Sequence, residues 1–397
     1  METGKFNVVI DAFWGSSGKG KLTTYLADKF ATTYISSSNY PNAGHSAVFE
    51  DGTKFVSKAI PTAAILKRVK GMDIRCFISP GSGFNPDQFL KEWLQSGMPE
   101  IHVHGRASLV TNEHAERERS GTDSTMHIAS TMQGSGAAIA DKIMRKKNVQ
   151  LTGNVPWREY ALHNAVPELG MVEQATFAER VMVEDPMDFR DLTHGILKVG
   201  TTWLHEGSQG YALSIDHGSH YPACTSRNCS LQAAMDHMAV PPQLIGDVYL
   251  NLRTYPIRVG NVIDPDGTQR GYSGDFYSDC EELTWEQVAE SSGMPPEEAR
   301  ALSERERTTV TKRIRRVSTF SYIGLKDSVR TNGATKLCLN FVQYLDWKDA
   351  GLRGGKKAFQ KLSMKTRIMI DKIEQVAGVP VVLIGTGPLN EDMISLL

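Results

Sequence analysis

Short apolar runs alternate along the chain with longer segments whose apolar residues follow helical spacing. The first run, Phe6–Phe13, is apolar and β-branched and ends at a glycine, which is typical of a buried parallel strand that enters a tight turn. From Lys21 to Phe30 the apolar residues follow helical spacing, so a strand, a loop and a helix are predicted at the start. Similar strands are predicted at Glu100–His104, Thr201–His205, Asp247–Tyr255, Leu337–Tyr344 and Val379–Ile384.

Helical patterns fall between these strands, at Ala137–Lys147, Trp285–Ser292, Pro296–Arg305 and Ala358–Ala377. Such alternation predicts an α/β fold with a large, mostly parallel twisted sheet and helices on both faces, similar to P-loop NTPases, with inserted loops. The region 260–315 has no clean linker composition and is interpreted as an excursion from this core. Residues 1–397 are therefore expected to form a single domain.

Composition and charge exclude several kinds of partner and site. The 44 Lys and Arg residues balance 45 Asp and Glu residues, so no global basic field favours a long nucleic acid as partner. No apolar run approaches the roughly 20 residues that a membrane span needs. The five cysteines are scattered and form no C-x-x-C pair, so neither a disulfide framework nor a zinc site is predicted and a cytoplasmic protein is expected.

A glycine-rich loop follows the first predicted strand. Residues 15–21 read G-S-S-G-K-G-K, and the backbone N–H groups of such a loop can hold phosphate oxygens together with a helix N-terminus. The loop departs from a Walker A motif because Leu22 stands where Ser or Thr is usual. The alternative is a plain strand-to-helix turn, although two lysines among three glycines favour an anion.

Three further segments carry candidate chemistry. His45, in the sequence N-A-G-H, could donate to a developing oxyanion or act as a general acid, or it could be structural. The glycine-rich segments 206–210, 215–218 and 221–228 offer amides and hydroxyls that suit a base edge and a phosphate. The basic run Thr311–Arg316 is either a solvated face or a clamp for carboxylates.

The order of these motifs resembles the adenylosuccinate synthetase family, from Val8 to Pro388. The shared sequence is W-G-x-x-G-K-G-K, N-A-G-H, E-G-x-Q-G with I-D-H-G, Y-P-x-x-T-S-x-N, T-x-R-x-R-R and a terminal G-T-G-P. The resemblance implies a Mg²⁺-dependent carbon–nitrogen ligase. In this family a carboxylate removes the N1 proton of a purine, O6 attacks the γ-phosphate of a nucleoside triphosphate, and the amine of L-aspartate then displaces phosphate.

The resemblance also assigns roles to residues of this chain. Catalytic positions are Ser16, Lys19, His45 and Gln209, and the magnesium positions are Gly44 and Ser16. The nucleoside triphosphate is expected at Ser17, Gly18, Lys19, Gly20, Ser46, Gln343, Gly385, Gly387 and Pro388. The purine nucleotide is expected at Ser16, Asn42, Ser130, Thr131, Arg145, Gln209, Thr225 and Val259, and the carboxylates of aspartate at Thr311, Arg313 and Arg315. Arg145 corresponds to an arginine that reaches the substrate phosphate from the partner subunit, which implies a homodimer.

One departure from the family lies in the phosphate loop. The family reads W-G-D-E-G-K-G-K, and its Asp is the general base and a magnesium ligand, whereas this chain has Ser16 and Ser17 in place of the two acids. A serine hydroxyl does not act as a base near neutral pH without help. Ser16 is also smaller, and the space beside N1 and C2 of the purine could hold the 2-amino group of guanine.

A second departure lies in the predicted strand that begins at Leu337. The family reads T-K-L-D-V-L-D there, and its first Asp pairs with the guanine of GTP; this chain has Phe341 for the Lys and Gln343 for that Asp. Loss of a bidentate acceptor removes discrimination in favour of guanine. An amide can pair with adenine, so ATP or dATP is the expected donor.

Both departures resemble the phage branch of the family, the 2-aminoadenylosuccinate synthetases. That branch acts on dGMP, so the expected reaction joins dGMP and L-aspartate and uses ATP or dATP, in the host cytoplasm if the gene is carried by a phage. Two alternatives stay open at this point. One is an ordinary synthetase that uses IMP and GTP, and the other is a nucleotide-binding relative without turnover.

Overall fold

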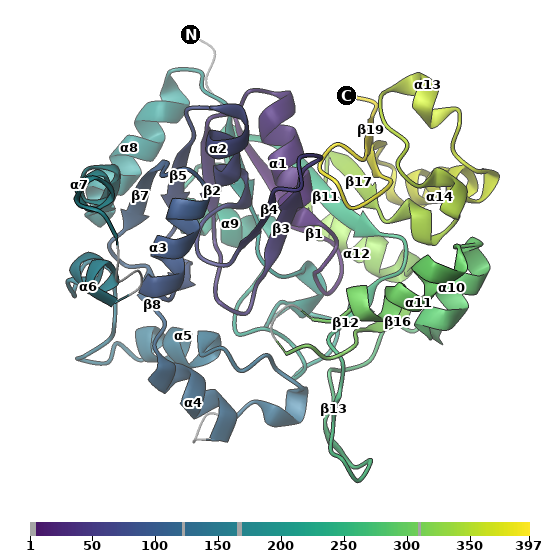
Figure 1. Ribbon diagram of the computed structural model, residues 1–397, viewed down its shortest axis with the longest axis horizontal. Helices are drawn as coiled ribbons and strands as arrows, with labels where there is room; N and C mark the ends of the chain where they lie inside the picture. The colour runs from purple at the N-terminus through teal and green to yellow at the C-terminus, as the bar shows by residue number, and fades with distance from the viewer. Residues whose placement is uncertain (1–4, 121–123, 165–168, 309–310) are drawn as a thin grey trace.

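The computed structural model describes residues 5–120, 124–164, 169–308 and 311–397, and one large sheet runs through its centre (Figure 1). Its ten strands lie in the order β19-β18-β17-β11-β1-β10-β2-β5-β7-β9, and every pair is parallel except β18 with β19. They are β1 (Phe6–Asp11), β2 (Tyr34–Ser37), β5 (Arg75–Ile78), β7 (Glu100–His104), β9 (Val181–Glu184), β10 (Trp203–Glu206), β11 (Ile245–Arg253), β17 (Lys336–Asn340), β18 (Val381–Gly385) and β19 (Met393–Ser395). This sheet confirms the predicted fold class.

Helices cover both faces of the sheet, because successive residues of a strand point to opposite sides. In β1, Val9 belongs to the apolar core under α1 (Lys19–Lys29) and α3 (Pro86–Gln95). Val8 and Ile10 belong to the opposite core, under α8 (Pro186–Lys198), α9 (Leu231–Met238), α12 (Tyr322–Asn332) and α14 (Met364–Ala377). The remaining helices are α2 (Leu66–Lys70), α4 (Asn112–Ser120), α5 (Ser135–Ile143), α6 (Trp157–Asn164), α7 (Met171–Arg180), α10 (Trp285–Ser292), α11 (Pro296–Arg305) and α13 (Lys356–Phe359).

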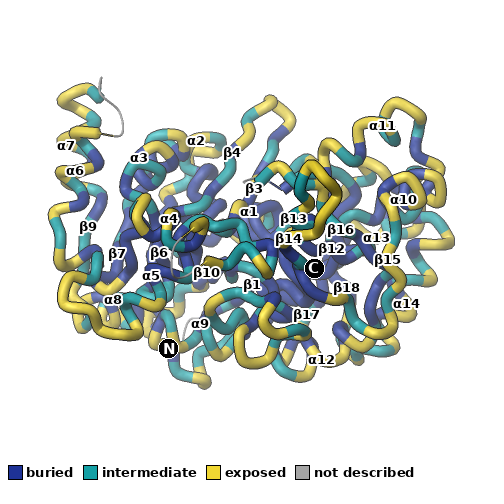
Figure 2. The backbone as a smooth tube through the Cα atoms, turned by 90° about the horizontal axis from the view of Figure 1, so that it is seen from below, coloured by how far each residue is buried: buried dark blue, intermediate teal, exposed yellow. Residues whose placement is uncertain are grey.

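Short strands form the excursions from the core. They are β3 (His45–Val48) with β4 (Lys54–Ser57), β6 (Gly83–Phe84) with β8 (Ser108–Leu109), β13 (Val262–Ile263) with β14 (Gln269–Gly271), and β12 (Ile257–Arg258), β16 (Arg316–Ser318) and β15 (Glu282–Leu283). The region 260–315 therefore leaves the sheet, and the β13–β14 hairpin projects from the body in Figure 1. Figure 2 shows buried residues along the central strands and exposed residues on the outer helices.

Several predicted elements have other bounds in the structure, and the strands Phe6–Phe13 and Asp247–Tyr255 end earlier, at Asp11 and Arg253. The strand Leu337–Tyr344 ends at Asn340, since Phe341 has a φ of 67° and a 3₁₀ turn follows it. The helix Ala137–Lys147 ends at Ile143, shortly before Arg145, whose φ is 54°. The helix Ala358–Ala377 is divided into α13 and α14, because Ser363 caps a new helix by accepting the N–H of Thr366.

The carboxyl ends of four neighbouring strands carry polar residues. Glu206 ends β10, Asp11 ends β1, Arg253 ends β11 and Asn340 ends β17. In open parallel sheets ligands bind at this edge, where the order of the strands reverses around the first strand. None of the described helices is long and apolar enough to cross a membrane.

Candidate active site

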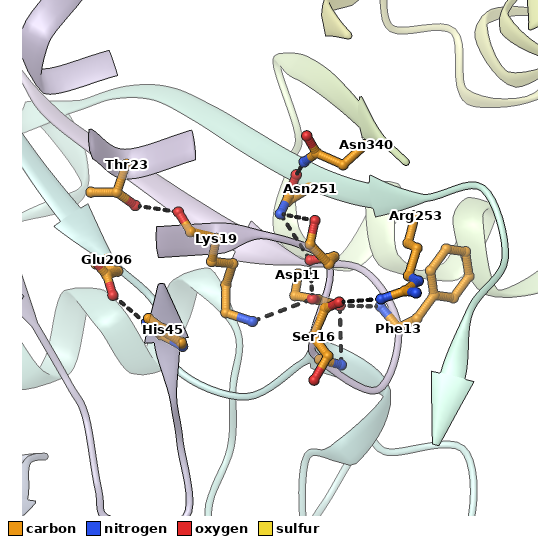
Figure 3. A network of polar contacts seen from close by, with 12 residues as sticks. Asp11, Phe13, Ser16, Lys19, Thr23, His45, Glu206, Asn251, Arg253 and Asn340 are labelled. Atoms are coloured by element: carbon orange, nitrogen blue, oxygen red, sulfur yellow. Dashed lines mark hydrogen bonds and ion pairs between the residues drawn. The ribbon is translucent and has the colours of Figure 1, made fainter. Parts of the chain in front are cut away.

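The carboxylate of Asp11 organises the loop that follows β1 (Figure 3). Its Oδ1 accepts the N–H of Phe13 at 2.8 Å and that of Gly15 at 3.3 Å. Its Oδ2 accepts the hydroxyl of Ser17 and lies 3.3 Å from Nζ of Lys19. Because Asp11 is only 1% exposed, these four donors replace the water that a carboxylate needs.

Two glycines bring the loop and α1 close to β3. Gly18 caps α1 with a φ of 93°, a left-handed conformation that glycine adopts without strain. A Cβ on Gly20 would lie 2.8 Å from the backbone N of Ser46 and 2.9 Å from Cβ of His45. The helix N-terminus therefore packs directly on the start of β3, and this contact places Lys19 and His45 in one site.

The two loop serines lie in different environments. Ser16 is exposed with a φ of 53°, and its carbonyl accepts a hydrogen bond from Arg253 at 2.9 Å. Ser17 is buried, donates to Asp11 and accepts from Nδ2 of Asn251 at 2.8 Å. Only Ser16 presents its side chain outward, whereas Ser17 contributes to the support of the loop.

His45 is held by a buried carboxylate. Its Nδ1 hydrogen-bonds to Oε1 of Glu206, which also accepts the hydroxyl of Thr62 at 2.9 Å, while Oε2 accepts the N–H of Thr62 at 2.9 Å. Burial by itself raises the pKa of Glu206, but the charge and hydrogen bonds of His45 and Thr62 outweigh it and lower the pKa. Glu206 therefore orients the imidazole with Nδ1–H inward, and Nε2 is left to act on a ligand.

Lys21 has a structural role that the loop motif does not reveal. Its Nζ donates to the carbonyls of Gly387 and Asp392, each at 2.7 Å, and burial lowers its pKa to about 7. This lysine joins α1 to the predicted triphosphate segment Gly385–Pro388. Gly385 and Gly387 permit the contact, since a Cβ on either would overlap Asn340 or Asp392.

Gln343 lies in the 3₁₀ turn after β17, the strand that pairs with β18. Its side chain is 6% exposed, and within the described part of the chain its Oε1 accepts no hydrogen bond. A buried amide oxygen without a donor costs free energy, roughly 1–3 kcal/mol, unless a ligand supplies the donor. Gln343 is therefore a candidate for contact with a bound amino group.

The predicted aspartate segment lies against the predicted nucleotide segment. Arg313 donates to the carbonyls of Ala129 and Ser130 at 2.7 and 2.8 Å, and to the hydroxyl of Thr311 at 3.1 Å. Arg315 contacts Glu306 at 3.3 Å instead. Burial lowers the pKa of both arginines, and Arg315 is partly compensated by Glu306. Both guanidinium groups thus have partners within the protein.

The other predicted residues differ in exposure. Asn42, Thr131, Gln209, Thr225 and Val259 are half-buried, and Gly44, Ser46, Arg145 and Pro388 are exposed. Gln209 has a φ of 63° and its backbone carbon would lie 3.7 Å from a Cβ on Gly15, so the segment 206–210 contacts the phosphate loop. Arg145 is separate from these groups within the chain, on the loop after α5.

Several residues of the site were not predicted from the sequence. Arg253 donates to Glu306 at 2.6 Å and stacks on Phe341, with its Cζ 3.9 Å from the ring centroid. Asn340 donates to Oδ1 of Asn251 at 2.7 Å. Asp11 and Glu206 complete this set. Their signal is a single polar residue at the end of an apolar strand, which the sequence does show at Asp11 and Glu206.

The fold and the site together define a nucleotide-dependent enzyme whose phosphate loop follows the central parallel strand. The adenylosuccinate synthetase family model matches residues 8–350. Over 346 residues the chain is 32% identical to N6-succino-2-amino-2'-deoxyadenylate synthase of cyanophage S-2L, with 85% of this chain and 82% of that protein covered. With the synthase of Vibrio phage phiVC8 it shares 30% identity over 352 residues, and coverage is 86% and 88%.

Solved structures agree with this relation. The chain superimposes on cyanophage S-2L succinoaminodeoxyadenylate synthetase bound to dGMP and dATP as an energy donor with a TM-score of 0.77, at 30% identity and with 99% and 96% of the two chains covered. The Plasmodium falciparum adenylosuccinate synthetase shares the fold, with a TM-score of 0.74 at 17% identity and coverage of 99% and 100%. The chain belongs to the adenylosuccinate synthetase family and is a carbon–nitrogen ligase.

The contact between Glu206 and His45 leads to a first testable prediction. Glu206→Gln should lower kcat about 10- to 100-fold, because a neutral amide holds the Nδ1–H of His45 less strongly than a carboxylate, and His45 must keep this proton while Nε2 donates. Since the pKa of Glu206 is lowered in the folded state, its contribution to stability is present at neutral pH and is lost as the pH falls below the usual range of a glutamate. Between pH 3 and 7, the thermal midpoint of the variant should therefore decrease less with falling pH than that of the wild type.

A matched control is Glu92→Gln, which changes another fully buried glutamate, on α3, that accepts backbone N–H groups of residues 58–60. This control should keep its kcat. Equal losses of activity in the two variants would show that Glu206 matters only for folding.

Proposed function

We propose that this ligase condenses L-aspartate with dGMP through a 6-phosphoryl intermediate, with ATP or dATP as the phosphoryl donor. The products are 2-amino-2'-deoxy-N6-succinyladenylate, phosphate and ADP or dADP. The proposal is supported by the identity with the two phage synthases and by the likeness to a structure that holds dGMP and dATP. Residues 1–397 would act as one catalytic domain.

The observation that carries the proposal is the exposed side chain of Ser16. Arg253 holds the carbonyl of this residue, so the small hydroxymethyl group points away from the protein where the family has a carboxylate. A carboxylate there would take the space beside C2 of the purine. A serine leaves room for a 2-amino group and can accept a hydrogen bond from it.

The choice of donor is supported by Gln343. The free Oε1 of its buried amide can accept a hydrogen bond from the N6 amino group of adenine, and its NH₂ can donate one to N1. Guanine presents N1–H and a 2-amino group, which suit an acceptor-only carboxylate better. The Gly385–Pro388 segment and the phosphate loop would hold the rest of the triphosphate.

A magnesium ion fits this site if the triphosphate supplies most of its ligands. Ser16 and Gly44 are both exposed and offer neutral hard oxygens, a hydroxyl and a carbonyl. Among the described residues, no three His, Cys, Asp or Glu side chains gather to bind a metal in advance. The ion would neutralise charge on the transferring phosphoryl group.

The other predicted residues of the chain would then have the following roles in binding and catalysis. Lys19 steadies the phosphoryl group, and His45, fixed by Glu206, donates from Nε2 to the developing charge on O6. Gln209 holds the purine base, while Asn42, Ser130, Thr131, Thr225 and Val259 surround the nucleotide. Thr311, Arg313 and Arg315 turn from their protein partners to the carboxylates of aspartate.

The first test of this function is the substrate. The ratio of kcat/KM for dGMP to that for IMP, measured by phosphate release with ATP and aspartate, should exceed about 10, because the 2-amino group fills the space beside Ser16. Ser16→Asp should reverse the ratio. Equal or better use of IMP by the wild type would refute the assignment of dGMP.

The donor provides a second test. The wild type should prefer ATP or dATP to GTP, and Gln343→Asp should shift the preference toward GTP by ~1–3 kcal/mol, roughly 10- to 100-fold. Gln360→Asp, a change outside the site in the turn after α13, serves as the control. A wild type that prefers GTP contradicts the proposal, and an unchanged ratio in Gln343→Asp contradicts only the role of this residue.

The partner subunit provides a third test. Arg145 is exposed beside Ile143 and Met144, which are 68% and 70% exposed, so this apolar corner fits an interface of a homodimer. Mixing Arg145→Ala with Lys19→Ala should restore activity through hybrid sites, up to about a quarter of the wild type if subunits exchange at random. Absence of activity in demonstrated hybrid dimers would place Arg145 outside the partner's site.

A further inference from the structure

The phosphate loop of this chain has no carboxylate, yet the proposed reaction must remove a proton from N1 of the purine. Three buried carboxylates lie next to the loop, at Asp11, Glu206 and Glu306. Glu206 is engaged by His45 and Thr62, and Glu306 by Arg253, Arg315 and Tyr344. In the described part of the chain, Asp11 is the carboxylate that hydrogen-bonds to loop side chains themselves.

The bonding of Asp11 leaves one of its oxygens available when ligands bind. The backbone N–H groups of Phe13 and Gly15 occupy Oδ1, whereas Oδ2 has the Ser17 hydroxyl and, at 3.3 Å, Nζ of Lys19 as partners. In the proposed function Lys19 moves to the transferring phosphoryl group. Oδ2 then keeps the Ser17 hydroxyl, which orients it, and gains a free lone pair.

Asp11 also faces the purine side of the site. It lines a small cavity of about 20 Å³ together with Ser208, Gln209 and Arg227. Ser208 Oγ and one Nη of Arg227 are buried there without partners among the described residues. The cavity is about as large as one water molecule, so a water in it would lie between Asp11 and Gln209 and could carry a proton from a purine that Gln209 holds.

We infer that Asp11, at the end of β1, is the general base of this ligase and takes the place of the carboxylate that the loop lacks. The inference rests on the proposed function. The N1–H bond breaks and its proton bonds to Oδ2 of Asp11. The electron pair passes through the ring to O6, which bonds to the γ-phosphorus as the bond from that phosphorus to the leaving diphosphate breaks. The neutral aspartate amine then bonds to C6 as the C6–O6 bond breaks, and it gives one proton to solvent. The phosphate that leaves with O6 takes up the proton from Asp11.

Asp11→Asn tests this role, because its amide oxygen can still accept the two backbone N–H groups. The variant should keep its thermal midpoint within a few degrees and its dGMP affinity within about threefold, and kcat should fall at least about 100-fold. The control is Asp247→Asn, at the opposite end of β11, where Asp247 pairs with Lys336. The control should keep its kcat. A folded Asp11→Asn protein with wild-type kcat overturns the inference.

A second variant separates the chemistry from the support of the loop. Asp11→Asn combined with Ser16→Asp returns a carboxylate to the loop, in the space that the 2-amino group would take, so it is assayed with IMP. Turnover of IMP at least about tenfold above that of Asp11→Asn supports a required carboxylate. A double variant that folds and binds IMP but stays at the rate of Asp11→Asn overturns it.

If Asp11→Asn does not fold, Asp11→Glu replaces it. This variant keeps the charge but displaces the oxygens by one methylene, so kcat should fall at least about tenfold while dGMP binding persists, and an unchanged kcat overturns the inference. The wild type is measured in parallel with dGMP and IMP. A preference of the wild type for IMP refutes only the proposed substrate. IMP also carries a proton on N1, so the role of Asp11 can then be tested by comparing the Asp11 variants with the wild type on IMP.

Discussion

The hydrogen bonds between Asp11 and the loop after β1 are the interaction on which the rest of the site depends. A loop of glycines and serines has many conformations, and a buried carboxylate with donors from residues 13, 15, 17 and 19 selects one of them. The loop in turn sets where α1 begins. The close approach at Gly20 then determines where β3 and His45 lie. The order of these contacts explains how a short sequence motif positions groups from distant strands.

The sheet was largely predictable because its central strands are buried on both faces and therefore read as continuous apolar runs. Four strands of this sheet were not predicted, β9 and β19 at its edges and β2 and β5 inside it. All four are short, with three or four residues, so their apolar runs give a weak signal. The overextended strand at β17 has a specific cause, since Phe341 is apolar but adopts a left-handed conformation that apolarity does not reveal. Ser363 divides the last predicted helix for a similarly local reason, the capping of one N–H.

The site was predictable as a set of segments but not as a set of contacts. The order of the motifs indicated the phosphate loop, the histidine and the arginine run, whereas only the structure distinguishes exposed Ser16 from buried Ser17. Lys21 resembles a phosphate ligand in the motif but contacts backbone carbonyls of the C-terminal segment. Asp11 was missed because one acid at the end of an apolar run is also what an ordinary strand end looks like.

Arg253 connects three segments that the proposed function assigns to three different ligands. One guanidinium donates to the carbonyl of Ser16 in the phosphate loop and to Glu306, the partner of Arg315, and it stacks on Phe341 near Gln343. A ligand that displaces any of these segments changes the free energy of the other two. Thermodynamic linkage makes that effect reciprocal, so triphosphate must alter the affinity for aspartate by the same factor by which aspartate alters the affinity for triphosphate. If the proposed function holds, this shared side chain would couple the binding of the three ligands.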